Sequence, residues 1–352
     1  MKQEIIDKIN RLASQDEPFL FVINYQGDKA FIRQLSDINP EECLFDFEGR
    51  GNSSDEMKNN SEKIAEISWQ IAPPLYEDYE RSFGIVKNNI MAGNSYLTNL
   101  TCKVPVSCNL SLEDIFHRAK GKYKLLLRRK RNLTPFVCFS PETFVRIKNG
   151  RIYSYPMKGT LDASLPDAEK QLMEDQKEAA EHATIVDLIR NDLSRVAENV
   201  RVDKYRYIDI LHTNKGDILQ TSSEISGRLP EDYRQHLGEI LDAQLPAGSI
   251  TGAPKDKTMQ IIHEAEGYDR GFYTGIMGIY DQGELNSAVM IRFVEEEASP
   301  SKTEKGKNPE VSRELYFKAG GGITSKSDCR KEYEEVIQKI YLPIQENPSS
   351  EY

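Results

Sequence analysis

The sequence predicts an α+β fold with a large mixed or antiparallel sheet, and three observations lead to that class. Extended runs come in adjacent pairs, as at 135–150 and 151–160, which meet at the hairpin turn signal Lys-Asn-Gly-Arg. Helical periodicity appears between groups of such pairs. A doubly wound sheet would need a regular strand–helix–strand alternation, and the chain lacks one.

The first third of the chain contains short elements separated by clear turn signals. The expected elements are, in order, a helix over residues 1–15, a hairpin over 19–35, a polar loop over 48–63, a helix over 73–93 and a strand over 95–106. Apolar residues recur at spacings of three and four between Tyr79 and Ile90, and Gly93 follows as a stop. This is the period of a helix with one buried face.

The rest of the chain has longer elements. The two extended runs named above are followed by a helical region over 167–197, strands around 216–229, 271–297 and 314–323, and a last helix over 329–345. The charged segment 295–312, rich in Pro and Ser, is interpreted as a long exposed hairpin loop.

Composition excludes several classes of protein. The 352 residues are 38% hydrophobic and 29% charged, as in a soluble globular protein. A net charge of −10 argues against nucleic-acid binding, which needs a basic surface. No apolar stretch reaches the length of a membrane span, and the N-terminus has no signal-peptide core. Five scattered cysteines without Cys-x-x-Cys spacing predict reduced, buried thiols in a cytoplasmic protein.

Two acidic helices offer candidate metal ligands. Glu178 and Glu181 lie three residues apart in one, and Glu332 and Glu335 lie three apart in the other, so each pair shares one helical face. Carboxylate oxygens suit Mg²⁺, which usually takes one or two of them and keeps several waters. The alternative is that all four glutamates are solvated, and the four residues taken alone favour that alternative.

Other candidates are isolated. Two glycine-rich turns, 245–255 and 317–328, would let backbone amides approach a ligand, although neither matches a phosphate-binding loop. Lys158 suits a nucleophile or base if burial lowers its pKa. Glu142 follows a proline on an apolar strand, and Arg292 lies in another apolar strand, where it would suit a carboxylate clamp. A structural salt bridge is the alternative for each.

Several of these stretches form one ordered set: SPETFVRI (140–147), YPMKGT (155–160), KEAAEHATIVDLIRNDLSRVA (177–197), LPAGSITGAPK (245–255), RGFYTGIMGIY (270–280), AVMIRF (288–293) and AGGGITSKSDCRKEYEEVIQKI (319–340). The set resembles the chorismate-utilising enzyme family, which includes anthranilate synthase component I, aminodeoxychorismate synthase component I, isochorismate synthase and salicylate synthase. The resemblance extends from about residue 75 to residue 341.

The resemblance implies one large domain of two stacked antiparallel sheets flanked by helices. Residues 71–345 would form the chorismate-binding domain, and the helix and strands of 1–70 would pack on it. The family binds a Mg²⁺ that holds the ring carboxylate of chorismate. The remaining implication is that Glu181 and Glu335 are direct metal ligands and that Glu178 and Glu332 are outer carboxylates that hold metal waters.

The resemblance also assigns substrate contacts by motif position. Glu142 resembles the general acid that protonates the departing C4 hydroxyl of chorismate, a step that needs a protonated carboxyl. Tyr273 and Arg292 resemble a clamp on the enolpyruvyl carboxylate. The remaining implied contacts are Gly320, Gly322 and Lys339 at the other carboxylate, and Gly159, Thr160 and Ser249 in the ring pocket.

Three positions bear on the reaction. Lys158 stands where anthranilate synthases carry alanine and aminodeoxychorismate synthases carry lysine, so it resembles a nucleophile that adds at C2 before ammonia adds at C4. Leu97 replaces the lysine base of isochorismate and salicylate synthases. Gln220 replaces a histidine that anthranilate and salicylate synthases use in pyruvate loss. The expected product is therefore 4-amino-4-deoxychorismate, a precursor of p-aminobenzoate and folate.

Two other functions stay open. Anthranilate synthase component I is the alternative enzyme, and a non-catalytic binding or docking subunit is an alternative of another class. Retention of the metal carboxylates and Glu142 argues against the second. The resemblance also implies that ammonia comes from a separate glutamine amidotransferase subunit, since the sequence contains no glutaminase Cys-His-Glu constellation. The short segment before the first matching helix makes feedback control by tryptophan unexpected.

Overall fold

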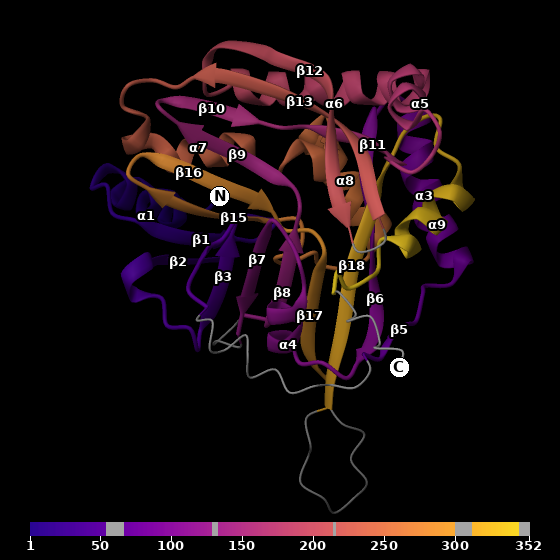
Figure 1. Cartoon of the computed structure of the whole chain (residues 1–352), viewed down its shortest axis with the longest axis horizontal. Helices are drawn as coiled ribbons and strands as arrows, with labels where there is room; N and C mark the ends of the chain where they lie inside the picture. The colour runs from indigo at the N-terminus through magenta and orange to yellow at the C-terminus, as the bar shows by residue number, and fades with distance from the viewer. Residues whose placement is uncertain (54–66, 129–132, 214–215, 300–311, 345–352) are drawn as a thin grey trace, which may run out of the picture.

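The computed structural model describes residues 1–53, 67–128, 133–213, 216–299 and 312–344. Within these ranges the chain forms two antiparallel sheets stacked on each other, with helices on their outer faces (Figure 1). The α+β class and the two stacked antiparallel sheets are confirmed.

The first sheet runs in the order β11-β13-β10-β9-β16-β15-β1-β2, and β12 pairs with β13. Strands β10 and β11 lie end to end along one edge of β13, while β12 lies along the other. The bounds are β1 Phe19–Ile23, β2 Ala30–Gln34, β9 Thr143–Lys148, β10 Arg151–Ser154, β11 Met157–Asp162, β12 Glu198–Thr213, β13 Gly216–Arg228, β15 Ile276–Asp281 and β16 Glu284–Val289.

The second sheet runs in the order β14-β6-β18-β17-β8-β7-β3-β4, and β5 pairs with β6. The bounds are β3 Cys43–Phe47, β4 Arg50–Gly51, β5 Trp69–Ile71, β6 Leu97–Cys108, β7 Tyr123–Leu127, β8 Phe136–Ser140, β14 Gly252–Ala253, β17 Phe293–Ser299 and β18 Ser312–Ile323. The first seventy residues contribute strands to both sheets, and the predicted boundary at residue 70 stays a prediction.

The helices are α1 Gln3–Ser14, α3 Tyr76–Met91, α4 Leu112–Arg118, α5 Ala168–Glu174, α6 Gln176–Ser194, α7 Leu237–Gln244, α8 Lys255–Glu266 and α9 Cys329–Gln338, with short 3-10 turns η1 Leu35–Asp37, η2 Tyr233–His236 and η3 Gly248–Ile250. The predicted stop of α3 is confirmed, since Gly93 has a φ of 77°, in the left-handed region that glycine favours after a helix. None of the described helices has the length and apolar character needed to cross a membrane.

Three apolar layers hold the fold together. Strand β1 is buried on both faces and shows how they alternate. Leu20 and Val22 face a middle core between the two sheets. Phe19 and Phe21 face an outer core that α1, α6 and α7 share with the first sheet. A third core joins α3, α4, α8 and α9 to the second sheet. Burying each large side chain contributes about 1.5–3 kcal/mol, so the stacked sheets form a rigid base for the site.

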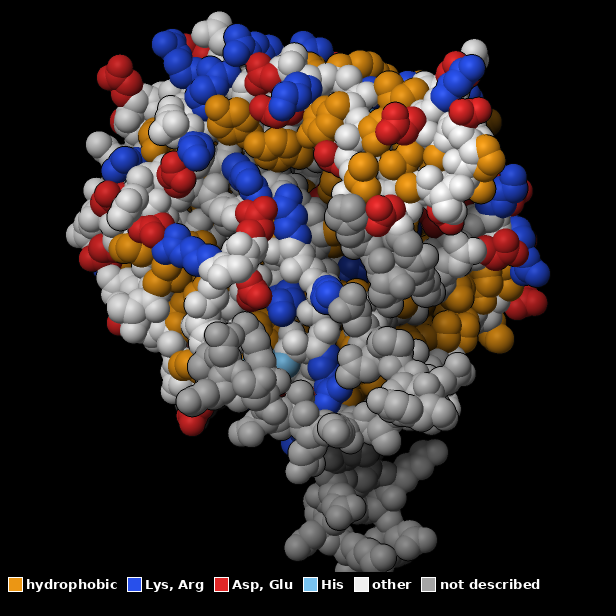
Figure 2. Space-filling model, viewed as in Figure 1, with side chains coloured by type: hydrophobic (Ala, Val, Ile, Leu, Met, Phe, Trp, Pro, Cys, Tyr) orange, Lys and Arg blue, Asp and Glu red, His pale blue; other side chains and the backbone are white. Residues whose placement is uncertain are grey.

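The chain carries ten more acidic than basic residues, and both signs are present on the face shown in Figure 2. On the face shown in Figure 2, acidic and basic side chains are interspersed around the rim, and hydrophobic side chains are exposed over the first sheet. The exposed hydrophobic residues include Tyr205 and Ile210 on the edge strand β12. All five cysteines are free, and Cys43 and Cys138 are buried, as expected for reduced thiols.

Two predicted loops are partly wrong. In the loop expected over 48–63, residues 50–51 form β4, which pairs with β3, and residues 54–66 lie outside the described ranges. In the loop expected over 295–312, residues 295–299 extend β17, and residues 300–311 lie outside the described ranges. The segment 317–328 was expected to form a glycine-rich turn, but Gly320 and Gly322 lie within strand β18.

The helical region expected over 167–197 is two helices. Asp175 separates them, and its carboxylate accepts hydrogen bonds from the backbone N–H groups of Lys177 and Glu178 at 2.8 and 2.9 Å. An aspartate N-cap of this kind starts a new helix and adds a negative charge to the positive end of its dipole. Helix α6 therefore begins at Gln176, directly after this cap, and Glu178 and Glu181 lie in its first two turns.

Two of the places where the chain passes from one sheet to the other carry predicted site residues. The chain leaves the second sheet after β8 and enters the first at β9, and Glu142 lies in this short link. It returns between β16 and β17, where Arg292 has a φ of 55°. The expectation that Arg292 lies within a strand is wrong. The extended run expected over 151–160 is two strands, β10 and β11, so Lys158, near the end of the expected run, is the second residue of a new strand.

Candidate active site

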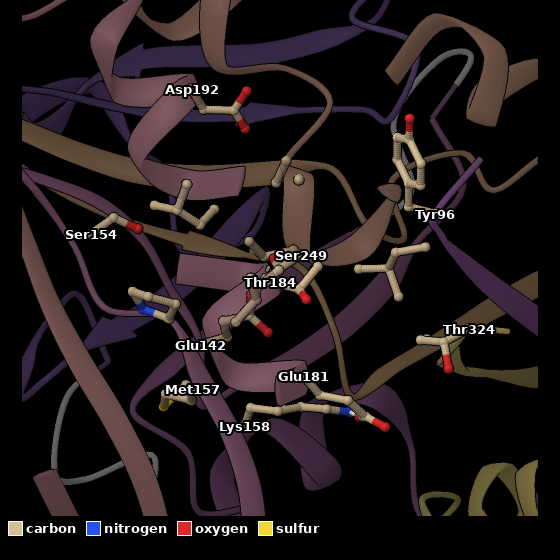
Figure 3. Close-up of a pocket in the computed structure, with 18 of the residues that line it drawn as sticks. Tyr96, Glu142, Ser154, Met157, Lys158, Glu181, Thr184, Asp192, Ser249 and Thr324 are labelled. Carbon is tan, nitrogen blue, oxygen red and sulfur yellow. Dashed lines mark hydrogen bonds and ion pairs between the residues drawn. The ribbon is translucent and has the colours of Figure 1, made fainter. Parts of the chain in front are cut away.

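A cavity of about 580 Å³ lies between α6, the sheet strands and the η3 turn. Its wall includes five of the residues that the sequence singled out: Glu142, Lys158, Glu181, Ser249 and Gly322. The other nine lie outside its wall: Gly159, Thr160, Glu178, Tyr273, Arg292, Gly320, Glu332, Glu335 and Lys339. Figure 3 shows Lys158 and Glu181 at one end of the cavity, and Glu142 and Ser249 near its middle.

Lys158 reaches the cavity from β11 and forms an ion pair. Its Nζ lies 2.9 Å from Glu181 Oε2, and the side chain is 38% exposed. Burial lowers the pKa of Lys158, but the hydrogen bond to Glu181 and the charges of Glu181, Glu178 and Glu335 outweigh it and raise that pKa. The sequence expectation of a lowered pKa is therefore wrong for this state, in which Lys158 is an ammonium. Thr221 Oγ1 donates to the Lys158 carbonyl oxygen and fixes the strand.

Glycine at position 159 allows helix α6 to approach β11. Gly159 has a φ of 77° at an irregularity in the β11–β13 pairing. A Cβ added there would lie 2.9 Å from Glu178 Oε2. That oxygen is buried and has no hydrogen-bond partner. Burial raises the pKa of Glu178, and the charge of Lys158 opposes that rise. An unpaired buried carboxylate oxygen is costly and calls for a cation or a water.

The second acidic pair lies on α9, beside β18. A Cβ added at Gly321 would lie 3.5 Å from Glu332 Oε2 and 3.9 Å from Glu335 Oε1, so this glycine faces both carboxylates. Lys339 Nζ lies 2.7 Å from Glu335 Oε1 and donates to the Gly320 carbonyl oxygen at 3.0 Å. Burial raises the pKa of Glu332. Burial also raises the pKa of Glu335, but Lys339 and Lys158 lower it overall.

These residues fit a hard cation only in part. Across the described residues, no three Asp, Glu, His or Cys side chains already converge as a complete metal site. The four carboxylates nevertheless share one electrostatic neighbour, Lys158. The charges of Glu178, Glu181 and Glu335 raise the pKa of Lys158, and, against the rise that burial causes, the charge of Lys158 lowers the pKa of Glu332. The donor chemistry is that of Mg²⁺, and the buried Oε2 of Glu178 has no hydrogen-bond partner among the described residues. We conclude that the donor set suits Mg²⁺.

Glu142 lies in the cavity wall and is held by two hydrogen bonds. Ser249 Oγ donates to Glu142 Oε1 at 2.6 Å, and the Glu142 backbone N–H donates to Ser140 Oγ at 3.1 Å. Burial raises the pKa of Glu142, and the Ser249 hydrogen bond and the charges of Arg292 and Lys339 only reduce that rise. A carboxyl whose pKa is raised keeps its proton closer to neutral pH, which suits proton donation.

The predicted carboxylate clamp consists of Tyr273 and Arg292, which lie outside the cavity wall. Tyr273 is 3% exposed, and its ring centroid lies 5.9 Å from that of Phe293 in the middle core. The guanidinium of Arg292 lies 5.5 Å above the ring of Tyr341. Arg292 is close enough to lower the pKa of Glu142. Neither clamp residue is part of the cavity wall, and of the two only Arg292 acts on the pKa of Glu142.

The positions that separate family members lie on either side of the same site. Leu97 is part of the cavity wall, and a Cβ added at Gly322 would lie 3.1 Å from its Cδ1. Gln220 is the partner of Thr160 in the β11–β13 register, which places it beside the Lys158 segment. The cavity therefore has a leucine, and no base, on the β6 side.

Sequence reasoning missed some residues of the cavity wall. Tyr96, Thr184 and Asp192 contribute to it, and Gly321 faces the carboxylates of α9. Thr184 was open to inference, because it lies three residues after Glu181 and so on the same helical face. Asp192 was open to inference in the same way, because it lies eleven residues after Glu181, about three helical turns. Its buried ion pair with Lys255 gave no signal, since it joins segments far apart in sequence.

Comparison with known proteins gives one consistent family. The chorismate binding enzyme family matches over residues 19–345. A Haemophilus influenzae protein described as an uncharacterised PabA-like protein is 46% identical over 343 residues, which cover 97% of each chain. Aminodeoxychorismate synthase component 1 of Salmonella typhimurium is 30% identical over 282 residues, 75% of this chain and 56% of that protein.

The solved structures agree with the fold. Anthranilate synthase component I from Streptococcus pneumoniae superposes with a TM-score of 0.62 at 25% identity, over 78% of this chain and 58% of that one. The Salmonella typhimurium and Streptococcus pneumoniae proteins thus carry the names of two different enzymes. The residues of the cavity have to distinguish between them.

Proposed function

Because the chain belongs to the chorismate binding enzyme family, we propose that it aminates chorismate at C4 to give 4-amino-4-deoxychorismate, the reaction of an aminodeoxychorismate synthase component I. The observation that carries the proposal is the amine of Lys158 in the cavity wall, 2.9 Å from Glu181. An alanine there would leave the cavity without a nucleophile on this strand.

The proposed reaction has two displacements. The amine of Lys158 adds at C2 of chorismate as the ring double bonds shift and the C4 hydroxyl leaves, taking the proton of Glu142 to form water. Ammonia then adds at C4, the double bonds shift back, and the Lys158 amine leaves C2. The sum is chorismate plus ammonia giving 4-amino-4-deoxychorismate plus water. Covalent catalysis replaces one difficult substitution with two easier ones.

The proton on Lys158 must move before the first displacement. An ammonium has no lone pair, so the nucleophile has to give its proton to an acceptor. Glu181 Oε2, at 2.9 Å from Nζ, is placed to take it. The same contact orients the amine while the substrate enters the cavity. Glu142, whose pKa is raised by burial, supplies the proton that the leaving hydroxyl needs.

We propose that Mg²⁺ is held by Glu181 and Glu335, with Glu178 and Glu332 holding its waters. When bound, this ion supplies positive charge for the ring carboxylate of chorismate. The residues of the chain do the rest: Lys339 is proposed to bind a substrate carboxylate with the amides of Gly320 and Gly322. Gly159, Thr160 and Ser249 are proposed to line the ring pocket.

The proposed source of ammonia is a separate glutamine amidotransferase subunit. The relative from Salmonella typhimurium is named as component 1, which supports a further component there. Free ammonium would replace that partner in a purified system. Activity with ammonium alone therefore tests this chain independently of any partner.

Anthranilate synthase component I is the second candidate. It is favoured by the Aquifex aeolicus enzyme of that name, which is 36% identical over 208 residues, 57% of this chain and 38% of that protein. Two residues argue against this candidate. Pyruvate elimination needs a base, and Gln220 is not one. Elimination also gains nothing from Lys158 as a nucleophile at C2. The two candidates differ in product: anthranilate appears together with pyruvate.

Product analysis decides between them. Purified protein is incubated with chorismate, Mg²⁺ and ammonium, and the products are separated and identified by mass. We expect 4-amino-4-deoxychorismate without stoichiometric pyruvate. Release of anthranilate and pyruvate would support the second candidate, and no Mg²⁺-dependent loss of chorismate would refute both.

A further inference from the structure

A cluster of three polar residues closes the loop that carries Ser249. The loop spans residues 245–254 and joins α7 to α8. Lys255 Nζ lies 2.9 Å from Asp192 Oδ2, and it also donates to the Gln244 carbonyl oxygen at 2.9 Å. Gln244 Nε2 in turn donates to the Asp192 carbonyl oxygen at 2.9 Å. We call Asp192, Gln244 and Lys255 the loop lock.

The loop lock is buried and ties both ends of the loop to α6. The side chains of Asp192 and Lys255 are 7% and 11% exposed, and Gln244 is buried. Gln244 and Lys255 flank the loop, so their contact brings its two ends together. A buried ion pair of this kind is a weak source of stability, but it fixes geometry when every group has a partner.

The loop is pressed against α6 at Gly248, one residue before Ser249. A Cβ added at Gly248 would lie 3.0 Å from Asp192 Oδ2 and 3.1 Å from Leu188. Only a residue without a side chain fits that distance without movement. The lock carboxylate therefore also determines how closely the backbone beside Ser249 approaches the helix.

The other side of the loop is held by the pairing of β14 with β6 and by residues just before β6 and after α8. Arg270 Nη1 donates to the Ile250 carbonyl oxygen at 2.9 Å, and the Tyr96 backbone N–H donates to the Ala253 carbonyl oxygen at 2.9 Å. The end of the loop is thus anchored independently of α6. What the loop lock adds is the position of the segment 247–249, on which Ser249 depends.

Asp192 does not lie at the reacting end of the cavity. Figure 3 shows it well away from Lys158 and Glu181, while Ser249 points toward Glu142. Its carboxylate is already paired with Lys255, so it offers no free charge to a substrate. Any effect of Asp192 on the reaction has to pass through the loop.

We propose that Asp192 and Lys255 are positioning residues, which hold Ser249 against Glu142 and so keep the acid in its reactive orientation. The inference rests on the proposed function, because it assigns the lock to the acid of that reaction. The Ser249–Glu142 hydrogen bond of 2.6 Å is the contact through which the lock acts. Arg292 and Lys339 are the charges that also influence the pKa of Glu142.

The test replaces both charged partners together, because removal of one would leave the other buried and unpaired. In the variant Asp192→Leu/Lys255→Met we expect kcat to fall about 10²-fold, the scale of a misplacement near 1 Å, with KM within about threefold. The falling limb of the kcat–pH profile should move to higher pH, because Glu142 loses the hydrogen bond that stabilises its charged form. The matched control is Glu113→Gln/Arg128→Met, a pair at 2.6 Å that lies outside the cavity wall, and it should keep the kinetics of the wild type.

A double-mutant cycle separates this role from a merely structural one. Ser249→Ala should lower kcat in the wild type but add almost nothing in the lock variant, since both remove the same contact. Equal losses in the two backgrounds, or unchanged kcat and pH profile in the lock variant, would overturn the proposal. If the lock variant does not fold, Gly248→Ala keeps both charges, displaces the loop from α6 and should give the same kcat and pH effects. A Gly248→Ala variant with wild-type kinetics would equally overturn it.

The failure of the proposed function would look different. A wild-type protein that leaves chorismate unchanged with Mg²⁺ and ammonium refutes the function, and the lock proposal with it. A wild type that is active, together with an additive cycle, refutes only the role of the loop lock.

Discussion

Gly159→Ala tests whether Mg²⁺ binding depends on the space that Gly159 leaves for Glu178, one of the four proposed metal-site carboxylates. Gly159 has a φ of 77°, and an alanine in that left-handed region costs about 1–2 kcal/mol of stability. Its Cβ would also lie 2.9 Å from Glu178 Oε2 and 3.3 Å from Leu172 Cδ1, so the carboxylate has to shift by a few tenths of an ångström. Changes to outer-shell partners typically weaken metal binding about 10–100-fold. We expect the dissociation constant for Mg²⁺ to rise about tenfold.

Gly150→Ala is the matched control. Gly150 has a φ of 70° in the β9–β10 turn, and a Cβ added there meets no atom within 4 Å. Both variants should lose about 1–2 kcal/mol in thermal unfolding, because they share the backbone strain. Only Gly159→Ala should bind Mg²⁺ more weakly in calorimetric titration. Equal metal affinity in the two variants would refute the placement of Glu178 in the metal site.

Three further predictions concern the acid and the core. Glu142→Gln, which keeps the shape but removes the transferable proton, should lower kcat by about 10²–10⁴-fold in steady-state assays with KM little changed; a small loss would exclude it as the acid. Since Glu142 must be protonated, kcat should fall as pH rises through its raised pKa, and Ser249→Ala should move that fall to higher pH; a move to lower pH would contradict the geometry. Gly278→Ala, whose Cβ would meet the Phe21 ring, should cost about 1–3 kcal/mol in chemical unfolding, and an unchanged midpoint would contradict the packing.

The layered fold was predictable because strong local signals agreed with the tertiary structure. The period of three and four in the helix that became α3, and the Asn-Gly hairpin that joins β9 and β10, each specify one conformation. The sheet crossings were harder. Nothing in the run 135–150 shows that β8 and β9 belong to different sheets, because both strands are apolar and Glu142 occupies a link of two residues.

The site was predictable to the extent that helical spacing and family motifs place it. Spacing of three put Glu178 and Glu181 on one face, and the resemblance brought Glu142 and Lys158 to one cavity. What the sequence did not supply is the environment of each group. The sign of the Lys158 pKa shift depends on Glu181, a residue 23 positions away, because its hydrogen bond and charge, together with the charges of Glu178 and Glu335, outweigh burial.

The most direct test of the central claim is a search for the covalent adduct on Lys158. Wild-type protein is mixed with chorismate and Mg²⁺ without ammonia, quenched, digested and examined by mass spectrometry, beside the Lys158→Ala variant. We predict that the wild-type peptide containing Lys158 gains the mass of chorismate less one water, that added ammonium discharges it, and that the variant carries none. A wild type that turns over without any adduct, with Lys158→Ala equally active, would contradict the account.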